Sequence, residues 1–372
     1  MNVIFTCGGT GGHINPAIAV ANLIRERHPD SKILFIGAKG HMEEQLVPKS
    51  GYELKCLKIS GMSREKSLNG FKKNLCNVSD TIRAVAQTKK IIREFQPDVI
   101  FGTGGYACFP ALMAGSGMKI PTAIHESNAI PGLTTKLVAD RVDRVMIAFP
   151  ESAKHYKKQV DMVGMPVRRE FIYKTREEAR KELGLDSRPL IVSAFGSQGA
   201  KAMNEVVAEL FRLEQDAGQP FQHIHAVGSY GWEWMPEYVR SKGVDLEHAD
   251  GITMKEYLYN MPTVMAAADI IISRAGASMC NEIAAAGTPC ILIPSPNVTN
   301  NHQEKNARVL EAGGGAVVVL EKDCSPEKMY ELVRQLLADE ARLEEMSRKL
   351  HTMVHLNSTE RICDIVETLS KR

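Results

Sequence analysis

The chain has 372 residues, of which 44% are hydrophobic and 24% charged, and its formal net charge is +2. This composition is typical of soluble globular proteins and excludes a disordered or fibrous chain. The length exceeds that of one ordinary core and indicates two domains. No run of about 18 uncharged apolar residues occurs, so we expect no membrane span. The first residues, MNVIFTCGG, lack the basic region of a signal peptide.

Cysteine and charge patterns narrow the function classes further. The eight cysteines are scattered and none forms a CxxC pair, so we expect reduced thiols in a cytoplasm, without a zinc site or a disulfide frame. Residues 1–165 carry 22 Lys and Arg against 14 Asp and Glu, whereas the rest of the chain carries 24 against 30. A basic N-terminal half indicates a phosphate, lipid-surface or nucleic-acid partner, although a chance asymmetry between two domains is an equal alternative.

Short apolar runs alternate with longer amphipathic ones along the whole chain. The helical pattern is clearest at 14–27 and 75–95. Strands are expected at 2–7, 32–37, 52–59, 98–102, 121–126 and 144–149, and again at 189–196, 221–228, 244–250, 269–275, 289–294 and 315–320.

This alternation predicts an α/β protein with two doubly wound parallel sheets, each covered by helices on both faces. A strand-like run ends near Gly164 and Pro166, and a charged helix follows it. We therefore expect an N-terminal domain over 1–165 and a C-terminal domain over 166–345. The segment 346–372 has no strand pattern and reads as helical.

Four glycine-rich stretches each connect an expected strand to an expected helix. They are CGGTGGH (7–13), FGTGGYACFP (101–110), FGSQGA (195–200) and SRAGASMCNE (273–282). Ligands of open parallel sheets bind at this edge, so two domains with two loops each predict a cleft that binds phosphates. The first stretch is not GxGxxG, because Ile14 takes the third glycine position, and it lacks the lysine of GxxxxGK[ST]. A dinucleotide and a P-loop triphosphate are both disfavoured.

The candidate site residues of the first half follow two of the strands. Gly9, Gly11 and Gly12 permit positive φ and close backbone approach, and His13 beside them is a candidate general base or oxyanion donor. A tight turn with a capping histidine is the alternative. The stretch IHESNAIPG places His125, Glu126 and Asn128 just past a strand, where an Asx-type turn is the alternative.

The second half offers groups suited to a nucleotide sugar. Ser197 lies before a helix start, and Glu282 follows the start of another helix at Gly276 by little more than a turn, where a carboxylate commonly binds ribose hydroxyls. A first-turn glutamate that complements the helix dipole is the alternative. His302, Gln303 and Asn306 suit sugar hydroxyls. No DxD pair occurs, so helix N-termini, Ser197 and Arg168 are the candidates for stabilising a leaving diphosphate.

Seven stretches together resemble the MurG family of N-acetylglucosaminyltransferases: GGTGGHINP, GTGGYACFP, HESNAIPG, GMPVR, GSQGA, SRAGASMCNEIAAAGTPCILIP and NHQEKNA. The resemblance implies a GT-B fold with the donor nucleotide mainly in the C-terminal domain and a final helix that crosses back to the N-terminal one. It implies inverting transfer of GlcNAc from UDP-GlcNAc to the C4 hydroxyl of undecaprenyl-diphospho-MurNAc-pentapeptide (lipid I). No cofactor, no metal and no nucleic acid are implied.

The resemblance also assigns roles to residues. Here HESN stands where the family more often has HEQN, and NHQ stands where some members have two glutamines, so Gln303 is assigned and His302 is not. His13 is the leading candidate base and Glu126 the second, and the loop with Gly104, Gly105 and Tyr106 is interpreted as the seat of the acceptor diphosphate. The donor contacts fall on Thr10, Gly11, Gly12, Asn128, Arg168, Ser197, Leu258 (through its backbone), Ala277, Ser278, Glu282 and Gln303.

A lipid-linked acceptor requires contact with a membrane. The segment 61–75 mixes four basic residues with apolar ones, which suits an anionic leaflet, whereas a solvated loop before a core-facing helix is the alternative. We expect a peripheral protein on the cytoplasmic face of the cell membrane, which meets cell-wall and division proteins. A UDP-GlcNAc 2-epimerase, a diacylglycerol glycosyltransferase and a non-enzymatic nucleotide-sugar binding protein are the other functions considered.

Overall fold

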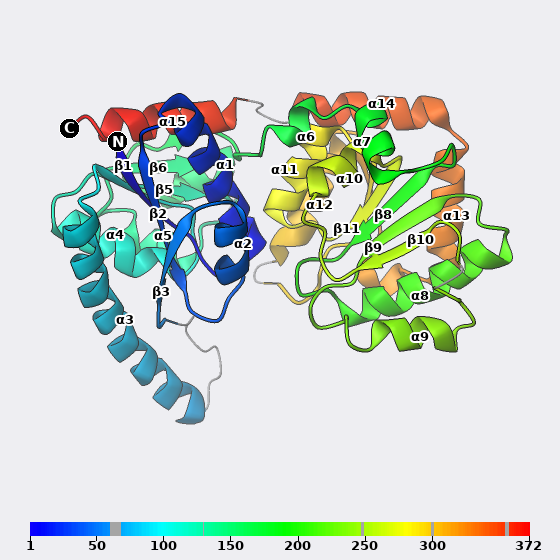
Figure 1. Cartoon of the computed structure of the whole chain (residues 1–372), viewed down its shortest axis with the longest axis horizontal. Coiled ribbons are helices and arrows are strands. Elements are labelled where there is room, and N and C mark those ends of the chain that lie inside the picture. The colour runs from blue at the N-terminus through cyan, green and yellow to red at the C-terminus, as the bar shows by residue number, and fades with distance from the viewer. Residues whose placement is uncertain (60–67, 129, 247–248, 299–300, 354–356) are drawn as a thin grey trace. The chain divides into compact units, whose positions relative to one another are not determined.

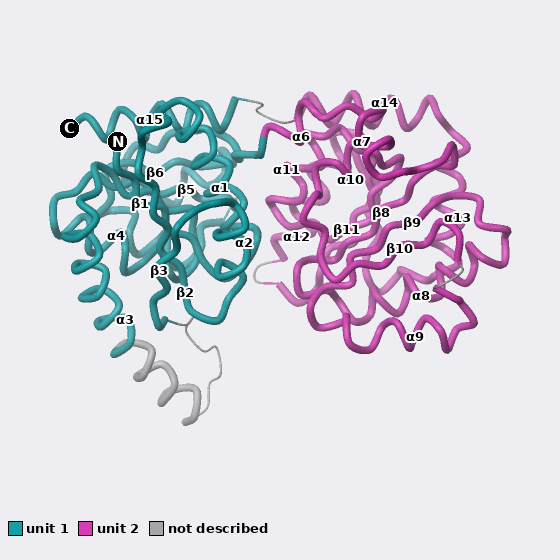
Figure 2. The backbone as a smooth tube through the Cα atoms, in the orientation of Figure 1, with its two compact units in different colours: residues 1–168, 355–372 teal, residues 169–354 magenta. Residues whose placement is uncertain are grey.

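A computed structural model describes the chain except for residues 60–67, 129, 247–248, 299–300 and 354–356, and it leaves the side chains of 68–78 undescribed. The chain divides into two compact units (Figure 2). Unit 1 contains residues 1–168 and 355–372, and unit 2 contains residues 169–354.

Unit 1 is built on a parallel sheet of seven strands in the order β3-β2-β1-β4-β5-β6-β7 (Figure 1). Thr6 at the end of β1 pairs with Gly102 at the end of β4, so the two strands finish side by side. Buried apolar residues fill β1 and β4 almost without interruption, as a sheet covered on both faces requires. All five residues of β5 are buried as well, although Thr122, His125 and Glu126 are polar. The strands are β1 (Asn2–Thr6), β2 (Lys32–Ala38), β3 (Glu53–Leu57), β4 (Val99–Gly102), β5 (Thr122–Glu126), β6 (Arg144–Ile147) and β7 (Asp161–Met162).

Helices connect the strands of unit 1, and the last helix of the chain also belongs to it. On α15, Cys363 Sγ donates to the Val20 carbonyl of α1 at 3.7 Å, and Asp364 pairs with Arg27 at 2.7 Å. The Thr359 hydroxyl of α15 donates to the Val167 carbonyl at 3.1 Å. The helices are α1 (Gly11–Arg27), α2 (Glu43–Lys49), α3 (Leu68–Phe95), α4 (Cys108–Gly117), α5 (Leu133–Val138), η1 (Pro150–His155) and α15 (Ser358–Leu369).

Unit 2 is built on a parallel sheet of six strands in the order β10-β9-β8-β11-β12-β13. Of the strand expected at 244–250, residues 247–248 lie outside the described residues, and the other five are not in a strand. β10 begins at Ile252, where its backbone pairs in register with His223 of β9. The alternating residues of 244–246 imitate a strand pattern, but the chain turns before pairing starts. The strands are β8 (Leu190–Ala194), β9 (Gln222–Ala226), β10 (Ile252–Lys255), β11 (Ile270–Ser273), β12 (Cys290–Leu292) and β13 (Ala316–Val318).

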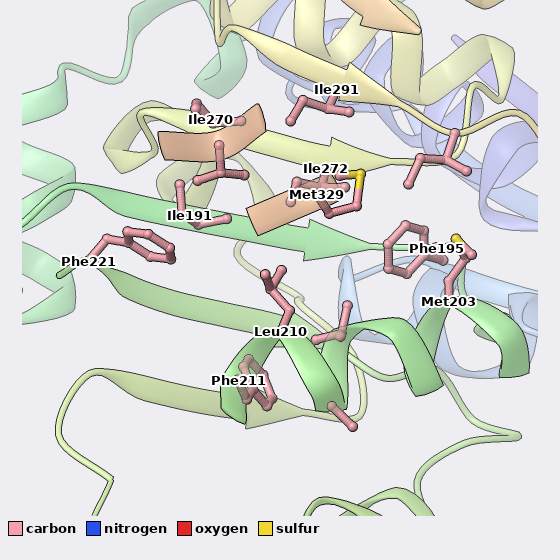
Figure 3. Close-up of a cluster of buried hydrophobic side chains, with 14 of the residues drawn as sticks. Ile191, Phe195, Met203, Leu210, Phe211, Phe221, Ile270, Ile272, Ile291 and Met329 are labelled. Carbon is pink, nitrogen blue, oxygen red and sulfur yellow. The ribbon is translucent and has the colours of Figure 1, made fainter. Parts of the chain in front are cut away.

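The core of unit 2 lies between its sheet and helices such as α8 (Figure 3). Leu210 of α8 packs toward strand residues that include Ile191 and Ile272, because apolar residues recur along one stripe of the helix. The ring of Phe211 meets His223 of β9 edge to face at 4.9 Å between ring centroids. The helices are α6 (Glu170–Tyr173), α7 (Arg176–Leu183), α8 (Lys201–Asp216), α9 (Met235–Ser241), α10 (Met261–Ala267), α11 (Ala277–Ala286), α12 (His302–Ala312), η3 (Glu321–Asp323), α13 (Pro326–Leu337) and α14 (Glu340–Met353).

The two parallel sheets with helical crossovers confirm the predicted doubly wound α/β class. The helical segment expected from 346 is divided between the units: α14 lies in unit 2 and α15 in unit 1. Among the described helices, none has the length and apolar character needed to cross a membrane.

Candidate functional site

The four glycine loops lie at the switch points of the two sheets. In unit 1, β1 and β4 are neighbours, and the chain continues from them toward opposite edges of the sheet. In unit 2, β8 and β11 have the same relation. Loops that diverge at such a point leave a crevice beyond the carboxyl ends of the strands, which is where doubly wound folds bind ligands. The loops following β1, β4, β8 and β11 are the four that the sequence singled out.

In unit 1 the two glycine loops pack backbone against backbone. A Cβ on Gly105, whose φ is +83°, would stand 2.3 Å from the Gly8 carbonyl oxygen. One on Gly104, at φ +101°, would stand 2.8 Å from two atoms of the His13 ring. Gly9 also has positive φ, but Gly11 is the first residue of α1, so the freedom expected of Gly11 and Gly12 is not used. Glycine at 104 and 105 therefore permits the close contact of the loops.

His13 lies in the first turn of α1 and is half-buried. Its Nδ1 is 2.9 Å from the Thr103 carbonyl oxygen, and the Thr103 hydroxyl donates to the His13 carbonyl at 2.6 Å. Because a carbonyl oxygen accepts and never donates, Nδ1 carries the proton in this bond. In the neutral ring the lone pair is then on Nε2, the form that a general base needs. Sequence reasoning missed Thr103, although it stands inside the GTGGY stretch.

Helix α1 begins without a side-chain cap. Thr10 is the N-cap residue but makes no side-chain capping bond, and the first turn contains no acidic residue. The helix begins three residues before the pattern expected at 14–27. A helix start of this kind favours negative charge nearby.

Glu126 lies at the end of β5 and is 3% exposed. Its Oε1 accepts from the Asn128 backbone N–H at 3.0 Å and from the Asn128 amide at 2.9 Å. Its Oε2 accepts from the Gly132 N–H at 3.0 Å. A carboxylate that three donors hold in the interior shapes the turn after β5. The geometry favours this role for Glu126 over proton transfer.

His125 precedes Glu126 in β5 and is fully buried. Its Nε2–H donates to the Gly164 carbonyl at 2.8 Å, and its Nδ1 has no hydrogen-bond partner. Burial lowers the pKa of His125 to about 4, despite the opposing effects of the Gly164 carbonyl and Glu126. The ring is therefore neutral near pH 7 and ties β5 to the chain after β7.

Tyr106 covers the first glycine loop. Its ring lies 3.2 Å from the position of a Cβ on Gly9, and it meets His41 edge to face at 5.5 Å between ring centroids. Burial, with Glu43 as the second cause, raises the pKa of Tyr106 to about 12. Glu43 is a buried carboxylate of α2 that sequence reasoning missed. In the sequence, Glu43 is marked only by its place at a helix start that follows a strand.

In unit 2, the loop after β8 meets the loop after β9 in the same way. A Cβ on Gly199, at φ +79°, would stand 2.1 Å from the Val227 carbonyl oxygen. The Ser229 N–H donates to the Ser197 carbonyl at 3.2 Å. Ser197 is half-buried and lies four residues before α8, so it does not cap that helix.

The loop after β11 leads into α11, whose N-cap is Gly276. No side chain caps this helix start, and its first turn contains no acidic residue, so it favours an anion near Ala277 and Ser278. Glu282 lies farther along α11 and is buried. The Asn306 amide donates to the Ala275 carbonyl at 3.1 Å, so this buried residue braces the loop, and its contact with a sugar stays a prediction.

The remaining predicted donor residues lie on three other segments. Gln303, in the first turn of α12, accepts the Ser295 N–H at 2.9 Å. Leu258 is buried between β10 and α10. Arg168 is half-buried and belongs to unit 1. The donor contacts of all three stay predictions.

A hollow of about 560 Å³ opens in unit 2 without any of the predicted donor residues in its lining. It lies at the start of α8 and at the loops after β12 and β13. Its lining residues are Ala202, Met203, Val206, Pro294, Ser295, Pro296, Asn301, Glu304, Leu320, Glu321, Lys322 and Cys324.

A second polar cluster is buried inside unit 2. Glu214 is 2.7 Å from His223 Nδ1, and the Ser193 hydroxyl is 2.7 Å from His223 Nε2 and from His225 Nδ1. The residue types are those of a hydrolase triad, but all four side chains are fully buried, so no substrate reaches them. Among the described residues, no group of three or more His, Cys, Asp or Glu is arranged to hold a metal ion.

The segment 61–75 is predicted to contact the membrane, and its residues 61–67 lie outside the described residues. From Leu68 the backbone is helical in α3, but the side chains of this part are not described.

Two family models match this chain, one in each half. The glycosyltransferase family 28 N-terminal domain matches residues 3–147, and the glycosyltransferase family 28 C-terminal domain matches residues 190–365. The crystal structure of Acinetobacter baumannii MurG has a TM-score of 0.71 and 25% identity, and 99% of each chain is covered. A UDP-N-acetylglucosamine–N-acetylmuramyl-(pentapeptide) pyrophosphoryl-undecaprenol N-acetylglucosamine transferase of Acetivibrio thermocellus is 42% identical over 100% of this chain and 99% of its own length. The chain belongs to the MurG family of N-acetylglucosamine transferases.

The family assignment confirms the resemblance drawn from the seven stretches and the GT-B class. A UDP-GlcNAc 2-epimerase of Neisseria meningitidis bound to UDP-GlcNAc is also similar to this MurG-family chain, with a TM-score of 0.66 over 100% of both chains. At 16% identity this likeness concerns the fold alone.

Proposed function

We propose that this chain transfers N-acetylglucosamine from UDP-GlcNAc to N-acetylmuramyl-(pentapeptide) pyrophosphoryl-undecaprenol, a step of peptidoglycan synthesis. The observation that carries the proposal is the 42% identity to a transferase of that name over the whole chain. The glycine loops at both switch points support it, because donor and acceptor each carry a diphosphate.

The proposed reaction inverts the anomeric carbon and forms a bond to the C4 hydroxyl of the acceptor sugar. The His13 Nε2 takes the hydroxyl proton as the oxygen attacks C1 of GlcNAc. The bond from C1 to the diphosphate oxygen breaks, and UDP leaves with the electron pair. The Thr103 carbonyl keeps the proton of His13 on Nδ1, which leaves Nε2 basic.

The nucleotide is proposed to bind unit 2. The uncapped starts of α8 and α11 present backbone N–H groups that stabilise the negative charge on the departing UDP. Ser197 adds a hydrogen-bond donor, and Glu282 and Gln303 bind hydroxyl groups of UDP-GlcNAc. Arg168, which belongs to unit 1, is a further predicted contact of the diphosphate.

Release of UDP from UDP-GlcNAc, measured with and without a lipid I analogue, tests the proposed transfer. A transferase releases UDP only when the acceptor is present. Equal release in both reactions, or conversion of UDP-GlcNAc to an isomer without any acceptor, contradicts the proposal and favours an epimerase.

The His13→Ala variant tests the base. Loss of a general base lowers kcat by about 100-fold or more, while the KM for UDP-GlcNAc stays near the wild-type value. His155→Ala removes an exposed histidine of the same unit and serves as the control. Turnover of His13→Ala near that of this control excludes His13 as the base.

We also propose that the protein binds peripherally to the cytoplasmic face of the cell membrane, where cell-wall and division proteins are its expected neighbours. The lipid-linked acceptor and the basic excess of residues 1–165 support this. Cosedimentation with anionic and with neutral vesicles, repeated with Lys72 and Lys73 changed to Gln, tests it. Unchanged binding of that variant excludes the segment 61–75 as the membrane contact.

A further inference from the structure

Glu43 lies beneath the first glycine loop and is fully buried, whereas glutamate side chains are usually exposed in folded proteins. It is the first residue of α2, just past the end of β2. Its Oε1 accepts the Ala38 N–H at 2.9 Å. The Gly9 N–H is 3.2 Å from Oε1 and from Oε2. The carboxylate therefore joins the end of β2 to the loop that follows β1.

The surroundings of Glu43 are built to admit its side chain. A Cβ on Gly37 would stand 2.6 Å from the Glu43 Cγ, so this position of β2 excludes any larger residue. A Cβ on Gly8 would stand 3.3 Å from Oε1. Two glycines thus leave the room that the carboxylate occupies.

The bond to Gly9 directs the loop. Gly9 has φ +89°, and its N–H points to Glu43, so that N–H is not offered to an anionic ligand. Only the part of the loop from Thr10 onward remains suited to a ligand.

The position of His13 depends on the same loop. The residue is fixed from β4 by its two bonds with Thr103. On the other side the chain enters α1 directly from Gly9 and Thr10, so the anchor of Gly9 fixes the start of the helix that contains His13.

We propose that Glu43 is a positioning residue for the transfer reaction: its buried carboxylate holds Gly9 and thereby sets the first turn of α1 and His13 for catalysis. This inference rests on the proposed function. Its chemistry is that of a carboxylate accepting backbone N–H groups, and Glu43 does not touch the reacting atoms.

The test compares Glu43→Gln and Glu43→Ala with Glu44→Gln, which changes the exposed neighbour on the same helix. Gln keeps one acceptor oxygen but places an amide opposite the Gly9 N–H, and Ala removes both acceptors. We expect kcat to fall about 10-fold for Gln and about 100-fold for Ala, because small displacements of a catalytic group have effects of this size. The KM for UDP-GlcNAc should change by a smaller factor than kcat, because the nucleotide is proposed to bind unit 2 and only the predicted donor contacts of Thr10, Gly11 and Gly12 lie in the displaced loop.

Hydrogen exchange of the peptide 7–13 supplies the second readout. Exchange should quicken in both Glu43 variants and stay unchanged in Glu44→Gln. Variants with a lower Tm but unchanged kcat per folded molecule overturn the proposal, as does a rise in KM with kcat unaffected. If Glu43→Ala does not fold, Glu43→Gln decides. If wild type itself shows no acceptor-dependent UDP release, the proposed function fails, independently of Glu43.

Discussion

The buried ring of His125 makes the stability of unit 1 depend on pH in a way that one substitution removes. His125→Gln keeps a side-chain N–H to donate to the Gly164 carbonyl, as Nε2 does at 2.8 Å in the wild type, but it removes the titrating group. The variant therefore separates proton binding from the hydrogen bond.

The magnitude follows from the two pKa values of His125. Burial lowers the folded-state pKa to about 4, whereas an unfolded histidine titrates near 6.5. Between these pH values the unfolded state binds more protons than the folded state. The contribution of the neutral His125 ring to the free energy of unfolding is therefore complete above pH of about 6.5 and is lost as the pH falls. From pH of about 7.5 to about 5 the loss in free energy of unfolding is about 2 kcal/mol, and below pH of about 4 it levels off near 3 kcal/mol.

Urea unfolding at both pH values measures this loss. Both tryptophans, Trp232 and Trp234, lie in unit 2, so fluorescence reports that unit and circular dichroism reports both. We expect the acid sensitivity of unit 1 to be about 2 kcal/mol smaller in His125→Gln than in the exposed control His155→Gln. Equal acid sensitivity of the two variants would refute a neutral, buried His125.

Three further predictions concern single residues. Burial, with His223 as the second cause, lowers the pKa of His225 to about 3. Protonation of the unfolded state should therefore lower the free energy of unfolding of unit 2 by about 2 kcal/mol between pH of about 7.5 and 5. His225→Asn should remove this acid sensitivity, measured by tryptophan fluorescence. Gly104→Ala places a Cβ 2.8 Å from the His13 ring and should lower kcat without changing UDP binding. The control Gly51→Ala also has positive φ, but its Cβ would meet only Arg25 at 3.5 Å, so kcat should stay unchanged. Gly199→Ala, 2.1 Å from the Val227 carbonyl, should weaken UDP binding measured by calorimetry, and Gly243→Ala, in open space, should leave it unchanged.

The fold could be predicted because apolar strands and amphipathic helices alternate with clear boundaries. The glycine loops could also be found, since strand–glycine–helix transitions are local patterns. The packing of these loops could not be predicted, because the contact of Gly105 with Gly8 joins segments far apart in the sequence. The start of β10 could not be predicted for the same reason, because pairing with β9 decides where this strand begins.

Individual roles were harder to predict than the loops. Glu126 and Asn306 have residue types suited to catalysis and sugar binding. In the structure Glu126 accepts from Asn128 and Gly132, and Asn306 donates to the Ala275 carbonyl, so both hold local loops. Glu43 carries no motif, and its importance follows only from its burial and from the N–H groups that it accepts. A sequence pattern does not show which way a carboxylate points.

Transfer of labelled GlcNAc tests the proposed function most directly. UDP-GlcNAc labelled in the sugar is incubated with the protein and a lipid I analogue, and the products are separated. The proposed function predicts that the label enters the lipid-linked acceptor in an amount equal to the UDP released. Label that remains on UDP as an isomer, or that appears as free sugar, would contradict it.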